Sequence, residues 1–163
     1  LEAADAHPPA DVGLDIVETY LSVHAVDGLD PGAYRWSPGG LEALDDAPAG
    51  ATGSGHELRR LATSLCLDQP LGGTSGFTAF HCADLDGLLD AGGARAYRVA
   101  QLAGGLAAGR LQLGAFAAGS GATGLTFYDD QIRRAFATDA APMLVSAVGT
   151  PAYSTSSGRR PDA

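Results

Sequence analysis

The segment that most constrains the fold runs from residue 94 to residue 118 and consists mainly of Ala, Leu, Gly, Val, Gln and Arg. This composition predicts one helix of about 25 residues, with helix formers outnumbering all others. Four glycines lie inside it: Gly104, Gly105, Gly109 and Gly114. Each costs about 1 kcal/mol relative to Ala, and close approach to another helix would offset that cost. We therefore expect a buried helix that packs against its own copy in a dimer. Arg110 interrupts the apolar run, which argues against a membrane span.

Branched and aromatic residues predict two strands nearer the N-terminus, over residues 16–26 and 33–36. Between them, residues 27–32 have the chemistry of a turn, because Gly tolerates positive φ and Pro fixes its own φ. The expected structure is a hairpin with a long tip, ended by the Ser-Pro-Gly-Gly sequence at residues 37–40.

The other expected elements follow from caps and short apolar runs. Ser54 and Glu57 fit a capping box that opens a helix through residues 58–65. Residues 77–80 are apolar and bounded by glycine, which predicts a buried strand. Asp129 and Asp130 begin another helix, and residues 143–148 form a strand that ends at Gly149.

Composition and charge limit the function classes. A chain of 163 residues, 45% hydrophobic and 18% charged, is neither a disordered tail nor a membrane bundle. Ten Arg, no Lys and 19 acidic residues give a net charge of −9, which disfavours general nucleic-acid binding. Residues 1–90 carry −12 and residues 91–163 carry +3, which together give that −9. A small anionic ligand would prefer the second part, unless the first simply presents a solvated acidic surface.

Cys66 and Cys82 are too few for a disulfide framework and lack the paired spacing of a zinc site. Free thiols are usual in the cytosol, so a cytoplasmic protein is expected. The first 15 residues have neither a basic start nor an apolar core, so we expect no signal peptide. Because the chain begins with Leu, a longer parent protein is an open alternative.

Gly119, Gly121 and Gly124 match the spacing GxGxxG. A dinucleotide-binding fingerprint needs a strand before these glycines and a helix after them, and here the order is reversed. The motif is therefore interpreted as a helix C-cap and turn, or as a place where the backbone comes close to a flat ligand.

Other residues with reactive or charged side chains indicate a catalytic, metal-binding or phosphate-binding role less clearly. His81 and Cys82 are strand neighbours that point to opposite faces, which favours a packed strand end over a nucleophile–base pair. Ser75 fails the GxSxG pattern of hydrolases. Capping of a helix accounts for Asp129 and Asp130 without a metal. The scattered histidines propose no metal site either; they are His7, His24 and His56. At the C-terminus, Arg159 and Arg160 are either a phosphate clamp or a frayed basic end.

Taken together, five stretches resemble the nitroreductase superfamily, specifically its SagB-type (azoline-oxidase-like) branch and related tandem nitroreductase proteins. They are residues 26–34, 66–69, 96–98, 121–130 and 148–151, in the order of the family. The likeness extends over most of the chain, from about Pro9 to Tyr153. It implies an α+β fold with an antiparallel-rich mixed sheet flanked by helices, and a long central helix at the interface of a homodimer.

The resemblance also implies FMN at the dimer interface. The residues expected to line its isoalloxazine ring are Gly121, Ala122, Thr123, Gly124, Leu125 and Thr126. Arg159 and Arg160 are the candidates for contact with the FMN phosphate. The Pro-Ser-Ala-Gly-type flavin loop of the family aligns with residues 9–12, so Pro9 and Ala10 are candidates as well. Here the Ser is lost and an acid, Asp11, is added.

Two further features of the family are missing from this sequence. The Arg- and Ser-rich phosphate segment of the family would lie before the first residue. The Lys-Tyr pair of azoline oxidases would fall near residues 91–92, and the chain has no Lys. An azoline oxidase is therefore disfavoured, and half of a tandem protein or a degenerate domain are the alternatives.

The leading interpretation is a single nitroreductase-like domain over residues 1–163, with arms at 1–15 and 150–163. It would be a homodimeric, cytoplasmic, FMN-dependent oxidoreductase with ping-pong turnover, in which the flavin carries the redox chemistry and no catalytic side chain is required. A nicotinamide or other reductant would donate electrons to an electron-poor or peptide-derived substrate. The alternative is a cofactor-free dimerisation or scaffold domain of the same fold.

Overall fold

A computed structural model describes residues 15–44 and 55–152. Its centre is a six-stranded sheet in the order β3-β2-β1-β4-β6-β5, in which every neighbouring pair is antiparallel. The strands are β1 (Glu18–Val23), β2 (Gly32–Ser37), β3 (Gly40–Ala43), β4 (Phe77–Ala83), β5 (Gly121–Leu125) and β6 (Ala141–Gly149). The helices are α2 (Gly55–Leu65), α3 (Leu71–Thr74), α4 (Leu85–Ala117) and α5 (Asp129–Ala135).

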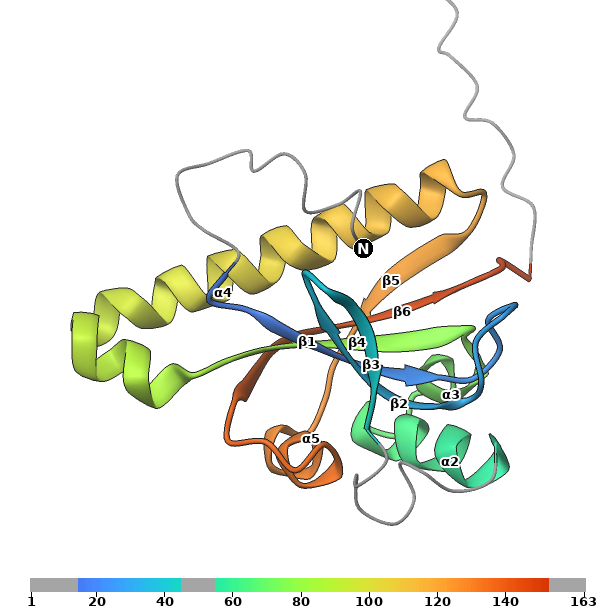
Figure 1. Ribbon diagram of the computed structural model, residues 1–163, viewed down its shortest axis with the longest axis horizontal. Helices are drawn as coiled ribbons and strands as arrows, with labels where there is room; N and C mark the ends of the chain where they lie inside the picture. Colours follow the sequence, from blue (N-terminus) through green and yellow to red (C-terminus); the bar gives the residue numbers. More distant parts are fainter. Residues whose placement is uncertain (1–14, 45–54, 153–163) are drawn as a thin grey trace, which may run out of the picture.

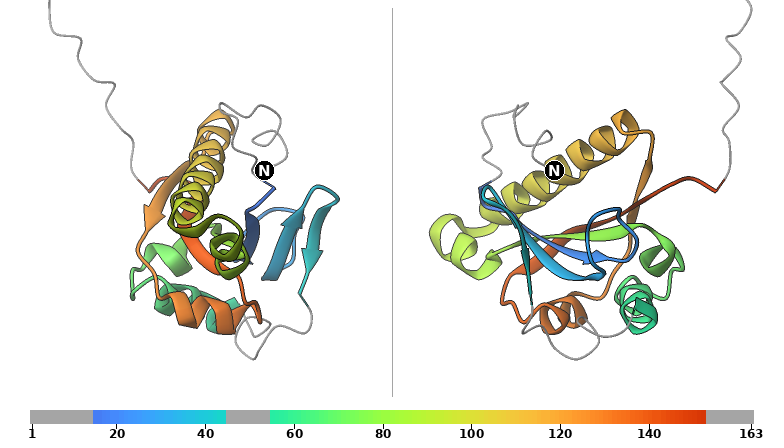
Figure 2. Two further views of the ribbon diagram at one scale, coloured as in Figure 1. Left: turned by 90° about the vertical axis from the view of Figure 1, so that its left-hand side faces the viewer. Right: turned by 45° about the vertical axis from the view of Figure 1, so that its right-hand side comes forward.

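The helices cover the two faces of the sheet unequally. The long α4 crosses one face, whereas α2 and α5 lie on the other side, with α3 beside α2 (Figure 1, Figure 2). A sheet buried on both faces needs apolar residues on both sides of its central strands, and β4 is buried almost throughout. The α+β fold class with a long helix is confirmed.

The expected N-terminal hairpin forms, with Thr19 opposite Trp36 and Val23 opposite Gly32. Its first strand is shorter than the predicted range of residues 16–26: β1 covers only Glu18–Val23. The prediction that residues 37–40 end the hairpin is incomplete. The chain turns there, with Gly40 at a φ of 119°, and returns as β3 against β2. Leu41, Glu42 and Ala43 have high helix propensity, yet they form a strand here because β2 has unpaired backbone groups with which they can form hydrogen bonds.

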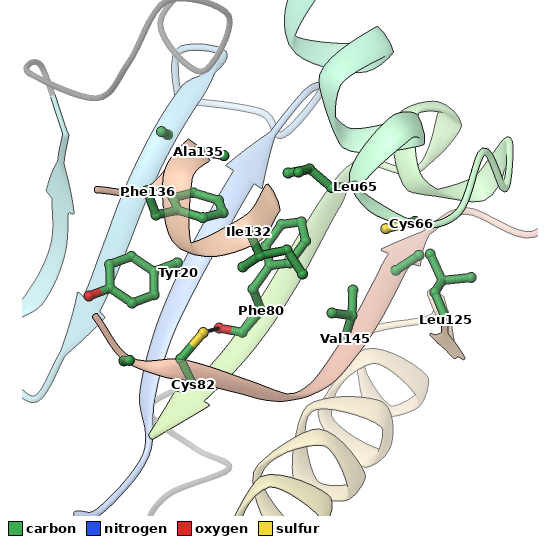
Figure 3. Packing of buried hydrophobic residues seen from close by; sticks show 13 residues of the cluster. Tyr20, Leu65, Cys66, Phe80, Cys82, Leu125, Ile132, Ala135, Phe136 and Val145 are labelled. Atoms are coloured by element: carbon green, nitrogen blue, oxygen red, sulfur yellow. Dashed lines mark hydrogen bonds between the residues drawn. The ribbon is translucent and has the colours of Figure 1, made fainter. Parts of the chain in front are cut away.

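The larger core lies between the sheet and the two helices α2 and α5 (Figure 3). Ile132 and Phe136 close over Phe80 of β4, and the Phe80 and Phe136 ring centroids are 5.1 Å apart. Leu65 and Cys66 at the end of α2 complete this cluster. Because strand residues alternate in direction, Ala79 faces the other way and packs with Leu111 and Ala115 of α4. The two faces of β4 thus serve two separate cores.

Helix α4 confirms the predicted long helix and extends it by a short N-terminal segment. That segment begins after Asp84, whose side chain accepts a hydrogen bond from the Gly87 N–H at 3.1 Å. Gly93, with φ 57° and ψ −154°, separates it from the main helix. Adjacent glycines at 92 and 93 conceal this continuation in the sequence, because glycine commonly marks the end of a helix.

The glycines of α4 divide between its two faces. The face toward the sheet carries buried residues, all of them Ala or Gly except Leu111: Ala96, Ala100, Ala103, Gly104, Ala108, Leu111 and Ala115. A Cβ added to Gly104 would lie 2.7 Å from the Met143 Cβ of β6, so this glycine serves helix–sheet contact rather than the expected helix–helix contact. Gly105, Gly109 and Gly114 have no neighbouring atom within 4 Å of such a Cβ.

The outward face of α4 leaves large apolar side chains in solvent. Leu102, Leu113 and Phe116 are 50%, 69% and 55% exposed. Within residues 15–44 and 55–152, no helix has the length and apolar character needed to cross a membrane.

Candidate functional site

The glycine-rich segment after α4 begins with a helix-ending motif. Gly119 has a φ of 73°, and its N–H donates to the Phe116 carbonyl oxygen at 3.1 Å. The Ser120 N–H donates to the Ala115 carbonyl oxygen at 2.8 Å, which completes a Schellman cap. The chain then enters strand β5. The helix–glycine–strand order confirms that these glycines do not form a dinucleotide-binding fingerprint, and it favours the C-cap interpretation for Gly119.

Strand β5 lies at the edge of the sheet and pairs only with β6 among the described strands. Gly124 is opposite Ser146, and a Cβ added at Gly124 would meet one atom, the Val145 carbonyl oxygen at 3.9 Å. Thr123, Gly124 and Thr126 are exposed, whereas Leu125 is buried in the larger core. An exposed edge strand without a covering side chain leaves room for a flat ligand beside its backbone.

Two glutamine side chains hold the ends of this strand. The Gln112 amide of α4 donates to the Ala122 carbonyl oxygen at 3.3 Å. The Gln69 amide donates to both oxygens of Thr126, the carbonyl at 3.1 Å and Oγ1 at 2.6 Å. Neither glutamine is a predicted site residue, although Gln69 lies in one of the stretches that carry the family resemblance. Gln69 and Thr126 are 57 residues apart, so no local pattern reveals their contact.

A serine, a histidine and a backbone carbonyl lie in line at the end of β1. Ser22 Oγ is 2.8 Å from His24 Nε2, and His24 Nδ1 is 3.2 Å from the Ser75 carbonyl oxygen. This geometry resembles a nucleophile–base pair, but Ser22 and His24 are only 3% and 5% exposed. Burial lowers the pKa of His24 to about 4. The group is a satisfied internal network that a substrate does not reach, so hydrolase chemistry remains unsupported.

His81 and Cys82 are buried on opposite faces of β4, as the strand alternation predicts. His81 Nδ1 is 3.0 Å from Thr19 Oγ1, and burial lowers the pKa of His81 to about 4. Burial also raises the pKa of both Cys66 and Cys82 to about 12. At neutral pH the histidines are uncharged and the thiols are protonated, so none of them is an activated nucleophile.

Asp129 and Asp130 are the first residues of α5, as predicted, but neither is its N-cap. That position belongs to Tyr128, which makes no side-chain capping bond. The capping explanation is therefore corrected: the two acids lie in the first turn, where the helix dipole favours them. In the described ranges, His, Cys, Asp and Glu form no group of three or more that could hold a metal ion.

Two surface grooves lie away from β5. One, of about 350 Å³, borders α5; the other, of about 690 Å³, borders α2 and α3. Of the predicted cofactor-binding residues, the structure brings together the run from Gly121 to Thr126 at the edge strand. Pro9, Ala10, Arg159 and Arg160 lie outside the described residues.

Comparison with known proteins gives structural likenesses. No family model matches the chain, and no curated protein sequence matches it. A solved structure described as a nitroreductase from Anabaena variabilis is 29% identical, with a TM-score of 0.74 over 85% of this chain. The Escherichia coli microcin synthetase McbBCD complex, with truncated pro-MccB17 bound, is 21% identical with a TM-score of 0.70 over 90% of it. A structure described as an NAD(P)H:FMN oxidoreductase from Staphylococcus epidermidis is 15% identical, with a TM-score of 0.60 over 98% of it.

This chain spans 28% of the Anabaena chain, 56% of the McbBCD chain and 78% of the Staphylococcus chain. Its sheet order, its long helix and these likenesses define an oxidoreductase fold of the nitroreductase type. This structural likeness to a nitroreductase confirms the resemblance found in the sequence.

Proposed function

We propose that this protein is an FMN-dependent oxidoreductase. The observation that carries the proposal is the exposed edge strand β5 in a nitroreductase fold, with Thr123 and Gly124 open to solvent. The likeness to a protein described as an NAD(P)H:FMN oxidoreductase supports flavin as the cofactor. In the part of the chain that the structure describes, burial keeps His24 and His81 uncharged and Cys66 and Cys82 protonated at neutral pH, so a cofactor would perform the reaction.

The residues present at β5 fit a flavin ring. A Cβ at Gly124 would meet only the Val145 carbonyl oxygen, at 3.9 Å, so the glycine leaves a shallow surface on which a planar group could lie. Gly121, Ala122, Thr123, Gly124, Leu125 and Thr126 would hold the ring through backbone groups. Bound FMN would supply the hydride and electron transfer that side chains cannot perform. Arg159 and Arg160 would hold its phosphate, and Pro9 and Ala10 would lie near the ring.

A homodimer would complete this site, with α4 at the interface. The outward face of α4 carries Leu102, Leu113 and Phe116 in solvent, and isolated chains rarely leave so many large apolar groups on one helix face. Gly105 and Gly109 on the same helix leave open space where a second backbone could come close. A second copy would bury these side chains.

Turnover would be ping-pong, with a nicotinamide or another reductant and an electron-poor or peptide-derived acceptor using one site in turn. The peptide-derived class follows from the resemblance to the SagB-type branch, and the likeness to the McbBCD complex supports it. Free buried Cys66 and Cys82 are consistent with a cytoplasmic location.

The test is a visible absorption spectrum after FMN is added and excess flavin is removed, for wild type and for Gly124→Val. We expect wild type to retain flavin. Gly124→Val places a branched side chain on the open surface of a strand, so it should keep the fold and lose most of the bound flavin. Gly55→Val, at the exposed first position of α2, is the glycine control. A colourless wild-type protein, expressed from its complete reading frame, would refute the proposal.

A further inference from the structure

Gln69 lies in the turn between α2 and α3, and its backbone is held on both sides. Its N–H donates to the Cys66 carbonyl oxygen at 3.1 Å, and its carbonyl oxygen accepts from the Gly72 N–H at 3.0 Å. The two residues before it, Leu67 and Asp68, have φ values of 54° and 56°. Residues other than glycine rarely adopt this conformation, which persists only where surrounding contacts enforce it. The turn therefore brings Gln69 to a fixed place.

The side-chain amide of Gln69 has two N–H groups and three oxygen acceptors within reach. Its Nε2 is 2.8 Å from the Cys66 carbonyl oxygen, which keeps one contact within the turn. The other two contacts are the carbonyl oxygen and Oγ1 of Thr126, 57 residues further along the chain. One side chain thus couples the α2–α3 turn to both oxygens of the residue that follows β5.

The neighbours of Thr126 explain why this coupling matters. Leu125 is buried in the larger core, Phe127 packs against the same core, and the Tyr128 N–H donates to the Leu65 carbonyl oxygen at 3.0 Å. Thr126 itself is exposed, so core packing does not fix its orientation. In the part of the chain that the structure describes, Gln69 provides the hydrogen bonds to its two oxygens.

We propose that Gln69 is a positioning residue that, through Thr126, fixes the 124–126 backbone on which the flavin ring would lie. This inference rests on the proposed function. Gln69 acts through Thr126 and needs no contact with the reacting atoms. The chemistry of the contact gives a sharp variant, because Gln69→Glu keeps the size of the side chain but places a carboxylate against two carbonyl oxygens, so that only the Thr126 hydroxyl can still donate to it.

The experiment compares wild type, Gln69→Ala and Gln69→Glu, each expressed from the complete reading frame. Amide hydrogen exchange is measured without flavin over residues 124–127 and over β4, and FMN affinity is measured by fluorescence titration. We expect both variants to speed exchange over residues 124–127 by about tenfold or more, while β4 stays unchanged. The Kd for FMN should also rise by about tenfold, since hydrogen bonds orienting the site are lost.

Two controls separate this role from a general loss of structure. Thr126→Ser keeps both acceptor oxygens, so its exchange and its Kd should stay within about twofold of wild type. Gln101→Ala removes an amide of the same kind that contacts Tyr97 and Met143 instead. Its exchange and its Kd should also stay close to those of wild type. If Gln69→Ala does not fold, Thr126→Val, which removes only the 2.6 Å contact, should show the same two effects on a smaller scale.

Unchanged exchange over residues 124–127 in both Gln69 variants would overturn the inference, whatever the flavin affinity. Faster exchange with an unchanged Kd would overturn it too, because the tether would then not shape the binding surface. If wild type fails to bind FMN, the proposed function fails and this inference fails with it. The wild-type titration therefore tests the function, and the comparison of variants tests Gln69.

Discussion

Gly104 and Gly105 are adjacent and identical in type, yet the structure gives them opposite responses to the same substitution. Replacing either by Ala removes an interior glycine from α4, which stabilises a helix by about 1 kcal/mol. At Gly105 the new methyl group enters open space, so that gain should be realised in full. At Gly104 the new Cβ would lie 2.7 Å from the Met143 Cβ, an atom fixed close to the β6 backbone.

Overpacking of this kind costs about 1–3 kcal/mol, because the helix or the strand must shift. The helix-propensity gain is common to Gly104→Ala and Gly105→Ala, so it cancels when they are compared. Their free energies of unfolding should therefore differ by about 1–3 kcal/mol, with Gly105→Ala the more stable. For a chain of this length, that corresponds to about 2–12 °C in Tm.

The assay is urea unfolding followed by far-ultraviolet circular dichroism, over a range of protein concentrations. Contact of Gly105 with a second copy would make its effect depend on concentration, whereas the contact of Gly104 with Met143 is internal and would not. If the two variants differ by less than about 0.5 kcal/mol at low concentration, the packing of α4 against β6 is wrong as described.

Two further predictions concern charge. Because the folded pKa values of His24 and His81 are lowered from 6.5 to about 4, the unfolded chain binds more protons between these values, so stability is complete above pH 6.5 and falls as the pH drops toward 4. Each histidine should cost up to about 3 kcal/mol over that range, measured by denaturant unfolding at several pH values; a stability curve that His81→Gln leaves unchanged would contradict this for His81. Replacing Arg159 and Arg160 together by Ala should weaken FMN binding by about tenfold or more, since charge-assisted phosphate contacts contribute about 1.5–3 kcal/mol each. Arg35→Ala, on β2 and four strands away from β5, is the control, and an unchanged Kd in the double variant would remove the pair from the site.

Local chemistry was enough to predict most elements of the fold. The helix over residues 94–117 follows from its helix-forming composition, and β4 and β6 follow from short apolar runs. Strand β5 is harder to predict, because a sequence of glycines and small residues has low strand propensity and forms a strand only where β6 pairs with it.

The candidate site, like the fold, could be predicted only in part from the sequence. The run from Gly121 to Thr126 could be proposed from the family resemblance, but the contact of Gln69 with Thr126 joins residues 57 positions apart. Likewise, nothing in the sequence separates Gly104 from Gly105, because their difference lies in what faces each one across space.

The order of strands in the sheet affects how the chain folds while it is being synthesised. The central strand β4 pairs with β1 on one side and β6 on the other, and partners such as Thr19 and His81 are 62 residues apart. Contacts so distant in sequence make folding slow, because long loops must close before the pairs form. On the ribosome, β4 gains its second neighbour only after Gly149 has left the exit tunnel. Until then the apolar face of α4 that β6 will cover stays open to other chains.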